Sequence, residues 1–291
     1  MTDPADGDGD DDGTDPAGGG DGATGPTSGS DDATDRAGSD DASRKRAAAD
    51  AFDAHASEYV DSAVHRAGDD LATLAAWCAD ADRALDIATG AGHTGGAIRD
   101  RGVPRVVVTD AAPSMVATAE AEFPGLVGTV ADAERLPFRD DAFDAVACRI
   151  AAHHFPDPAA FVDEVARVLR PGGVFAFEDN VTPEDDALDE FLNRVERLRD
   201  PSHVRSHRPS EWREWVTDAG LDVEESRIIK KTIDYRDWVD QLDTPEENRR
   251  ELETLFGDTP EGARDLYEIT HDDDGLASFA NLKVLLRATK G

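Results

Sequence analysis

Cysteine is almost absent from this sequence, which has only Cys78 and Cys148 among its 291 residues. Both lie in apolar surroundings, so we expect no disulfide framework and a reducing, cytoplasmic compartment. Long apolar runs are also missing, and none approaches the roughly 20 residues of a membrane-spanning helix. The N-terminus lacks the apolar stretch of a secretion signal. We therefore expect a cytoplasmic protein without membrane insertion.

Basic residues are scarce: 30 Lys and Arg stand against 64 Asp and Glu, which gives a formal net charge of −34. Because phosphate binding needs a basic stripe and none is visible, the composition argues against a nucleic-acid partner. Lysine is especially rare. A surface rich in Asp and poor in Lys is typical of proteins built for high salt, where screening removes self-repulsion. The composition gives no indication of oligomeric state.

Residues 1–43 contain no aromatic residue and consist mainly of Asp, Gly, Ala, Ser, Thr and Pro. Such a segment cannot bury enough apolar surface to fold, so we predict a disordered acidic tail. The remainder, 44–291, is expected to form one domain. Apolar residues at helical spacing predict N-terminal helices over 44–82, with a break near Gly68.

Strand-like and helix-like runs then alternate along the chain. We predict strands at 83–88, 105–109, 126–130, 143–149 and 173–179, and helices at 92–101, 113–122 and 157–170. A helix at 209–219, a strand at 221–228 and a last strand from Phe279 to Ala288 follow. This alternation predicts an α/β fold with a parallel sheet and helices on both faces. The two stretches outside it, 180–208 and 229–275, are expected to form a substrate lid.

The segment 85–96 has the form of a buried strand, a Gly-rich turn and a helix. Asp110 follows Gly90 by 20 residues, at the end of the next apolar run. That spacing suits a carboxylate that binds the two hydroxyls of a ribose, so we expect an adenosine-type cofactor. The glycine pattern also fits NAD, but Asp86 inside the strand would repel a pyrophosphate and favour a cation. A cationic, adenosine-containing cofactor is S-adenosylmethionine.

Several motifs together resemble the class I S-adenosylmethionine-dependent methyltransferases, in particular the small-molecule, type 11 branch that includes ubiquinone/menaquinone C-methyltransferases. They lie at residues 85–92, 108–115, 131–138, 143–146 and 164–173. The resemblance implies a Rossmann-like, doubly wound sheet of seven strands, mostly parallel with an antiparallel last strand, and methyl transfer to a small-molecule acceptor. Two alternatives stay open: an NAD-dependent oxidoreductase, and a non-catalytic cofactor-binding interaction protein.

The resemblance also assigns roles to residues that would bind the cofactor. Small residues at the turn would let its methionine part approach, Asp86 would attract the ammonium, and Asp110 would hold the ribose. Asp132 would accept from the adenine amino group, and Arg149 would lie beside the methionine carboxylate or the methyl group. The full expected set is Asp86, Gly90, Ala91, Gly92, Asp110, Ala111, Met115, Asp132, Ala133 and Arg149.

Candidate catalytic groups are expected where the fourth and fifth strands end, because a hydroxyl or amine acceptor must lose a proton. A neutral imidazole can take up a proton near pH 7. The candidates are His153 and His154 after the fourth strand, Asp179 at the end of the fifth, and Arg199 and His203 in the first insertion. We expect no metal site, because adjacent histidines cannot easily face one ion.

Overall fold

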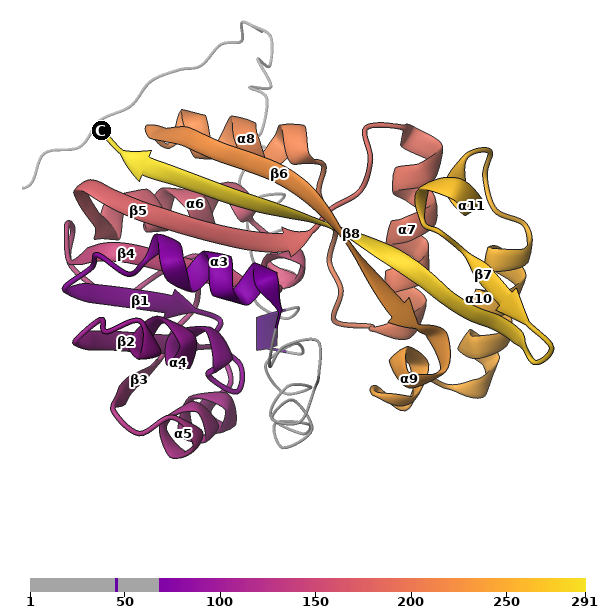
Figure 1. The fold of residues 1–291 in the computed structure, drawn as a ribbon, viewed down its shortest axis with the longest axis horizontal. Helices are drawn as coiled ribbons and strands as arrows, with labels where there is room; N and C mark the ends of the chain where they lie inside the picture. The colour runs from indigo at the N-terminus through magenta and orange to yellow at the C-terminus, as the bar shows by residue number, and fades with distance from the viewer. Residues whose placement is uncertain (1–44, 47–67) are drawn as a thin grey trace, which may run out of the picture. The chain divides into compact units, whose positions relative to one another are not determined.

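The computed structural model describes residues 45–46 and 68–291, which belong to one unit, Ser39–Gly291 (Figure 1). The predicted acidic tail, 1–43, and most of the predicted N-terminal helices lie outside the described residues. The helices are α3 (Asp69–Trp77), α4 (His93–Asp100), α5 (Pro113–Glu122), α6 (Pro158–Val168), α7 (Asp186–Arg199), α8 (Pro209–Asp218), α9 (Tyr235–Asp240), α10 (Glu246–Gly257) and α11 (Ala263–Leu266), with a 3₁₀ turn at Ala152–His154. The strands are β1 (Arg83–Ile87), β2 (Arg105–Asp110), β3 (Leu126–Val130), β4 (Phe143–Arg149), β5 (Leu169–Asn180), β6 (Leu221–Asp234), β7 (Thr270–Asp272) and β8 (Gly275–Lys290).

The sheet has the strand order β3-β2-β1-β4-β5-β8-β6 (Figure 1). The first five strands of this order pair in parallel, and β8 is antiparallel to both of its neighbours. The predicted doubly wound sheet with an antiparallel last strand is therefore confirmed. The carboxyl ends of β1, β2, β4 and β5 meet at one edge, where ligands bind in open α/β sheets.

Apolar residues cover both faces of the sheet. Leu74 of α3 and Ile98 of α4 pack with small strand residues on one face, and Phe161 of α6 and Trp212 of α8 pack with larger ones on the other. Trp212 and Trp238 are buried in the core. Among the described residues, no helix is long and apolar enough to cross a membrane.

Three predicted boundaries were wrong. The strand predicted at 221–228 continues to Asp234 because all of it pairs with β8. The last strand begins at Gly275 rather than Phe279 because its first residues pair with β7. The helix predicted to end at 170 ends at Val168, where β5 begins. Both ends of the second predicted insertion therefore belong to the sheet, and an eighth strand, β7, pairs with β8.

The β6–β8 ribbon extends beyond the end of β5 and carries the helices of both insertions (Figure 1). Phe191 of α7, Phe256 of α10 and Tyr267 after α11 form one apolar cluster with Phe279 of β8. We call α7, α9, α10 and α11 the helical lobe. Aromatic packing on the ribbon stabilises this lobe.

Candidate functional site

A Gly-rich turn connects β1 to α4 at the edge where the parallel strands end. Gly90 and Gly92 have φ angles of 53° and 93°, a region in which glycine carries no steric penalty. A Cβ at Gly92 would lie 2.8 Å from the Cβ of Ala119, whereas nothing lies within 4 Å of the equivalent point on Gly90. The turn therefore packs tightly against α5 on one side and presents bare backbone on the other.

Asp110, at the end of β2, connects this turn to the next one. Its Oδ2 accepts a hydrogen bond from the backbone N–H of Gly90 at 2.9 Å, and its Oδ1 accepts from that of Ala112 at 2.9 Å. The carboxylate thus lies beside the Gly-rich turn, where the spacing of 20 residues places it. A charged acceptor next to exposed backbone can bind the hydroxyls of a ribose.

Asp86 is buried beneath the same turn, with only 1% of its surface exposed. Its Oδ2 accepts hydrogen bonds from Thr89 Oγ1 at 2.6 Å and from the backbone N–H of Gly95 at 2.9 Å. Burial raises the pKa of Asp86 to about 7, although both hydrogen bonds work to lower it. These hydrogen bonds hold the turn in place. A buried negative charge here lowers the stability of the fold unless a cation lies near it.

The residues expected around an adenine lie on two further segments. Met115 of α5 is buried, Ala111 is exposed, and Ala133 is partly buried. Asp132 Oδ2 accepts a hydrogen bond from Lys45 Nζ at 2.7 Å, and Lys45 also forms an ion pair with Glu134. An adenine bound at Asp132 would therefore compete with Lys45 for the same oxygen.

Arg149, at the end of β4, is buried in an ion-pair network. Its Nε donates to Glu178 Oε2 at 2.8 Å, and its Nη2 donates to Asp70 Oδ2 at 2.7 Å. Lys231 of β6 lies 3.0 Å from the same oxygen of Asp70. Burial works to raise the pKa of Asp70, but Arg149 and Lys231 outweigh it and hold that pKa below its ordinary value. The network connects α3 to three strands of the sheet.

This network predicts a large stability effect. Asp70→Ala is expected to lower the free energy of unfolding by about 3 kcal/mol, because it leaves buried positive charge without its partner. Urea unfolding in molar potassium chloride measures the change. Asp69→Ala is the matched control, since Asp69 precedes Asp70 in the first turn of α3 but is exposed. Equal losses in the two variants would contradict the stabilising role of the ion pairs.

Backbone strain concentrates where β1 and β4 end. Ala88 has a φ of 51° and Ile150 a φ of 54°. Residues other than glycine rarely adopt a positive φ, and a β-branched residue such as Ile150 does so least often. The N–H of Ile150 donates to the carbonyl of Glu178 at 2.8 Å, which fixes the turn after Arg149. Strained residues of this kind cluster at functional sites. Both turns lie at the edge of the sheet that carries the predicted site residues.

Three histidines gather after β4. His153 Nδ1 lies 2.7 Å from Asp179 Oδ1, and the ring centroids of His153 lie 4.2 Å from His154 and 5.4 Å from His203. Burial raises the pKa of Asp179 to about 7. Burial, together with the neighbouring His154, lowers the pKa of His153 well below its ordinary value. The structure thus brings together four of the five predicted catalytic candidates around a neutral imidazole.

The segment 200–208 returns from α7 to this histidine cluster. The backbone N–H groups of Val204 and Arg205 both donate to the carbonyl of His153 at 3.0 Å. His154 Nδ1 lies 3.1 Å from the carbonyl oxygen of Ser202 and 3.2 Å from its Oγ. These contacts attach the first insertion directly to the end of β4.

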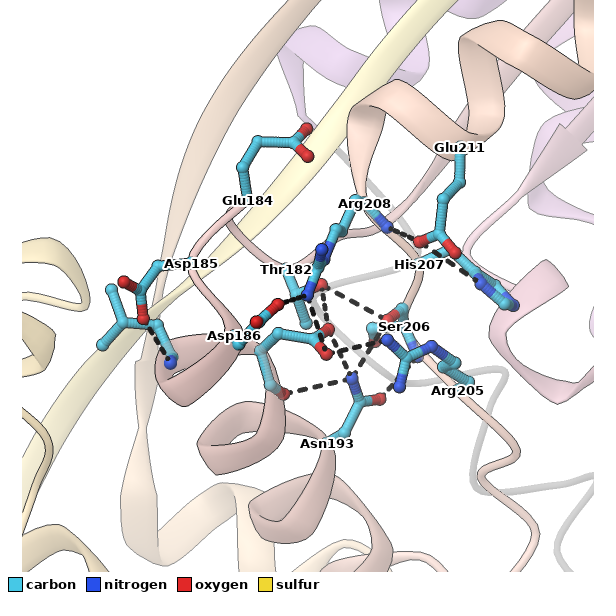
Figure 2. Close-up of polar contacts among 12 residues, drawn as sticks. Thr182, Glu184, Asp185, Asp186, Asn193, Arg205, Ser206, His207, Arg208 and Glu211 are labelled. Carbon is cyan, nitrogen blue, oxygen red and sulfur yellow. Dashed lines mark hydrogen bonds and ion pairs between the residues drawn. The ribbon is translucent and has the colours of Figure 1, made fainter.

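Asn193 of α7 holds this returning segment in place (Figure 2). Its Nδ2 donates to the carbonyl of Ser206 at 3.1 Å, and its Oδ1 accepts from the N–H of Ser206 at 2.8 Å. The same Oδ1 lies 3.2 Å from His203 Nε2, so a neutral His203 carries its proton on Nε2. Asp189 Oδ2 receives a further hydrogen bond from Arg205 at 2.7 Å. The network positions His203 beside His153.

Arg199 lies apart from the histidines. Its Nε donates to the carbonyl of Trp238 at 3.1 Å, and its Nη2 donates to Gln241 Oε1 at 3.1 Å. Its guanidinium also lies 5.1 Å from the centroid of the Trp238 ring. These contacts connect the end of α7 to α9 within the helical lobe.

The predicted site residues do not include a group of buried polar residues on β5, β8 and α7. They are Glu178, Asn180, Glu196, Asn281 and Lys283. Asn281 and Lys283 interrupt the apolar part of β8, and this was the one local signal that could have identified the group. The others become notable only when the strand register brings them together. Among the described residues, no group of three or more His, Cys, Asp or Glu side chains could hold a metal ion.

Comparison with known proteins identifies the family. A family model described as a methyltransferase domain matches residues 85–177. An uncharacterised methyltransferase of Bacillus subtilis, YcgJ, is 38% identical over 242 residues, which cover 81% of this chain and 95% of that protein. The crystal structure of a putative methyltransferase from Bacillus halodurans aligns with a TM-score of 0.73 at 36% identity, covering 77% of this chain and 99% of that one.

A ubiquinone/menaquinone biosynthesis C-methyltransferase from Desulfotalea psychrophila is 34% identical over 116 residues, 38% of this chain and 47% of that protein. The chain therefore belongs to the methyltransferase family, as its motifs predicted. This membership favours methyl transfer over the NAD-dependent alternative.

Proposed function

We propose that the protein transfers a methyl group from S-adenosylmethionine to a small-molecule acceptor. One observation carries the proposal: the carboxylate of Asp110 lies 2.9 Å from the N–H of Gly90 beside a turn of bare backbone. Buried Asp86 beneath the turn provides the negative charge that a sulfonium compound with an ammonium group would meet. The residues present thus fit this cofactor, which supplies a methyl group on a positively charged sulfur.

The chain's own residues would bind and orient the two reactants. Asp110 holds the ribose, Asp86 attracts the ammonium, and Asp132 releases Lys45 to bind the adenine. Arg149, fixed by Asp70 and Glu178, contributes positive charge near the methionine carboxylate. Methyl transfer depends on alignment, so fixed side chains of this kind favour the reaction.

His153 is the proposed base for an acceptor that loses a proton. Asp179 lies at its Nδ1, which favours the tautomer with the proton on Nδ1 and leaves Nε2 as the basic nitrogen. The low pKa that burial gives His153 keeps the ring neutral before the reaction. The rings of His154 and His203 lie beside the ring of His153.

We propose further that the segment 180–208 and the α9–α11 region act as a substrate lid. The first of these leaves the carboxyl end of β5 and returns to His153 through two backbone hydrogen bonds of 3.0 Å. The second is attached to it through Arg199 and Trp238. Elements so placed can exclude water from the reacting atoms.

Calorimetry with S-adenosylhomocysteine in molar potassium chloride tests the proposal. Binding is expected, together with a stabilisation of about 2.7 kcal/mol when the ligand is present at a hundred times its Kd. Absence of both heat and a rise in melting temperature would contradict the proposed function. Transfer of a labelled methyl group into small molecules of a cell extract then separates an enzyme from a non-catalytic binding protein.

Asp110→Ala is expected to weaken S-adenosylhomocysteine binding by about 1–3 kcal/mol, because charge-assisted hydrogen bonds to the ribose are lost. The same calorimetry measures the change. Glu122→Ala, which removes an exposed acid at the end of α5, is the matched control and should leave the affinity as it was. An unchanged affinity in Asp110→Ala would remove this residue from the cofactor site.

A further inference from the structure

Two charged side chains of α6 hold the segment 131–138, which lies between β3 and β4. Glu164 Oε2 accepts a hydrogen bond from the backbone N–H of Leu136 at 2.6 Å. Arg167 Nη2 donates to the carbonyl oxygen of Leu136 at 3.1 Å, and its Nη1 donates to that of Phe138 at 2.7 Å. Three backbone groups of the segment thus bind to side chains of one helix, which fixes the path of the segment.

Glu164 and Arg167 are also bound to each other. Arg167 Nε donates to Glu164 Oε1 at 2.6 Å, and its Nη2 donates to Glu164 Oε2 at 2.7 Å. Such a two-point contact between a guanidinium and a carboxylate fixes the orientation of both side chains. The hydrogen bonds from Arg167 hold the pKa of Glu164 below its ordinary value, so the pair stays ionised near neutral pH. The two side chains therefore act as one rigid support.

The first half of the segment is held at the start of the same helix. The backbone N–H of Asp157, the residue before α6, donates to Glu134 Oε1 at 2.8 Å. The backbone N–H of Glu134 donates to Asp132 Oδ1 at 3.0 Å, and that of Arg135 donates to the carbonyl oxygen of Asp132 at 3.0 Å. The side chain of Asp132 thus closes a turn with its own backbone two residues later. Its Oδ2 contacts Lys45, and the side chain is 42% exposed, so a donor group of a ligand can reach this oxygen.

We propose that Glu164 and Arg167 are positioning residues for the nucleobase of the cofactor. By holding the segment 131–138, they place Asp132 Oδ2 where it accepts from the amino group of adenine. An acceptor fixed in this way cannot turn away from a carbonyl at the same position of another base, so it selects adenine over hypoxanthine. This inference rests on the proposed function, in which Asp132 binds the adenine.

Arg170 provides a comparison within the same stretch of chain. It lies three residues after Arg167, and its Nη1 forms an ion pair with Asp144 Oδ1 at 2.7 Å. Asp144 Oδ2 in turn accepts from the backbone N–H of Asp82 at 2.7 Å. Arg170 therefore also supports backbone through a carboxylate, but among the described residues it forms no hydrogen bond or ion pair with the segment 131–138. Its loss should leave the choice of base unchanged.

The probes are S-adenosylhomocysteine and S-inosylhomocysteine, whose hypoxanthine base has a carbonyl where adenine has its amino group. Calorimetry uses the full chain in molar potassium chloride. The wild type is expected to bind S-adenosylhomocysteine at least about tenfold more tightly, because the carbonyl of the other base meets the carboxylate of Asp132. Arg167→Met is expected to weaken S-adenosylhomocysteine binding about fivefold, as for the loss of one hydrogen bond. The affinity for S-inosylhomocysteine should stay unchanged, because this ligand does not use the fixed oxygen.

Arg170→Met is the matched control and should leave both affinities as they are in the wild type. Arg167→Lys keeps the charge but not the forked geometry, so an intermediate preference is expected. This variant also covers the case in which Arg167→Met does not fold. In an Asp132→Ala background the preference for adenine should be lost, and Arg167→Met should change it no further, because the two residues act through one contact.

An equal loss of affinity for both ligands in Arg167→Met would show that Arg167 supports only the fold, and would overturn the proposal. An unchanged preference in both Arg167 variants, a wild type without preference, or an effect of Arg167→Met that persists in the Asp132→Ala background would also overturn it. Failure of S-adenosylhomocysteine to bind the wild type would instead contradict the proposed function.

Discussion

Replacing His153 with glutamine is expected to slow methyl transfer to a hydroxyl or amine acceptor by about 10²- to 10⁴-fold, the usual contribution of a general base. Glutamine keeps a polar side chain of similar length but cannot take up a proton near neutral pH. The affinity for S-adenosylhomocysteine should stay unchanged, because His153 is not among the residues proposed to bind it. The effect should therefore appear in kcat rather than in cofactor binding.

Asp179→Asn tests whether the contact between Asp179 and His153 is needed for methyl transfer. Asp179 Oδ1 lies 2.7 Å from His153 Nδ1. An asparagine amide can donate to Nδ1, which would move the ring proton to Nε2 and remove the basic nitrogen that the acceptor needs. The variant is thus expected to lose activity although a hydrogen bond remains.

These rates are measured with the acceptor that labelled-methyl transfer into a cell extract identifies. His271→Gln on β7 is the control, because His271 is exposed and far along the chain from the histidine cluster. A rate for His153→Gln equal to that of the control would show that His153 only packs beneath the returning segment. It would not affect the assignment of the cofactor site.

Asp86→Asn is expected to stabilise the protein at pH 8 and to weaken cofactor binding. Burial raises the pKa of Asp86 from 3.8 to about 7. Protonated Asp86 therefore contributes fully to the stability of the fold below about pH 4. This contribution to the free energy of unfolding is lost as the pH rises through about 7. The ionised carboxylate then costs the fold at most about 4 kcal/mol. An asparagine oxygen can accept the same bonds from Thr89 and Gly95 without the charge.

The pH dependence distinguishes this explanation from a general packing effect. Unfolding by urea should give Asp86→Asn a higher stability than the wild type at pH 8 and a similar one near pH 4. Asp82→Asn, an exposed acid beside β1, should show no such difference. Equal stabilities of Asp86→Asn and wild type at pH 8 would mean that the charge is compensated within the fold.

The same variant should bind S-adenosylhomocysteine more weakly, because the ligand's ammonium loses a buried carboxylate partner. Calorimetry at pH 8 measures this. Asp86→Asn is thus expected to raise stability and to weaken cofactor binding. This combination is typical of a charge that serves function and lowers the stability of the fold. If both properties improved, Asp86 would have no part in binding the cofactor.

Much of the secondary structure of this protein follows from local sequence. The apolar runs and the glycines after them determine the alternation of strands and helices, because period and turn chemistry are short-range properties. The 20 residues between Gly90 and Asp110 fix two neighbouring strand ends in one βαβ unit, so the contact between Asp110 and the Gly-rich turn could be predicted. The long insertions were visible as breaks in the alternation.

Only the tertiary structure decided the rest. The order of the strands and the register of β8 against β5 bring Glu178, Asn281 and Lys283 to one face, and no local pattern encodes that arrangement. The continuation of β6 to Asp234 depends on pairing with a strand that lies more than 40 residues later. Long-range pairing also directs His203 to His153. The sequence alone therefore determined the class of fold and the Gly-rich turn after β1, whereas packing between distant segments decided where the buried charges of the protein meet.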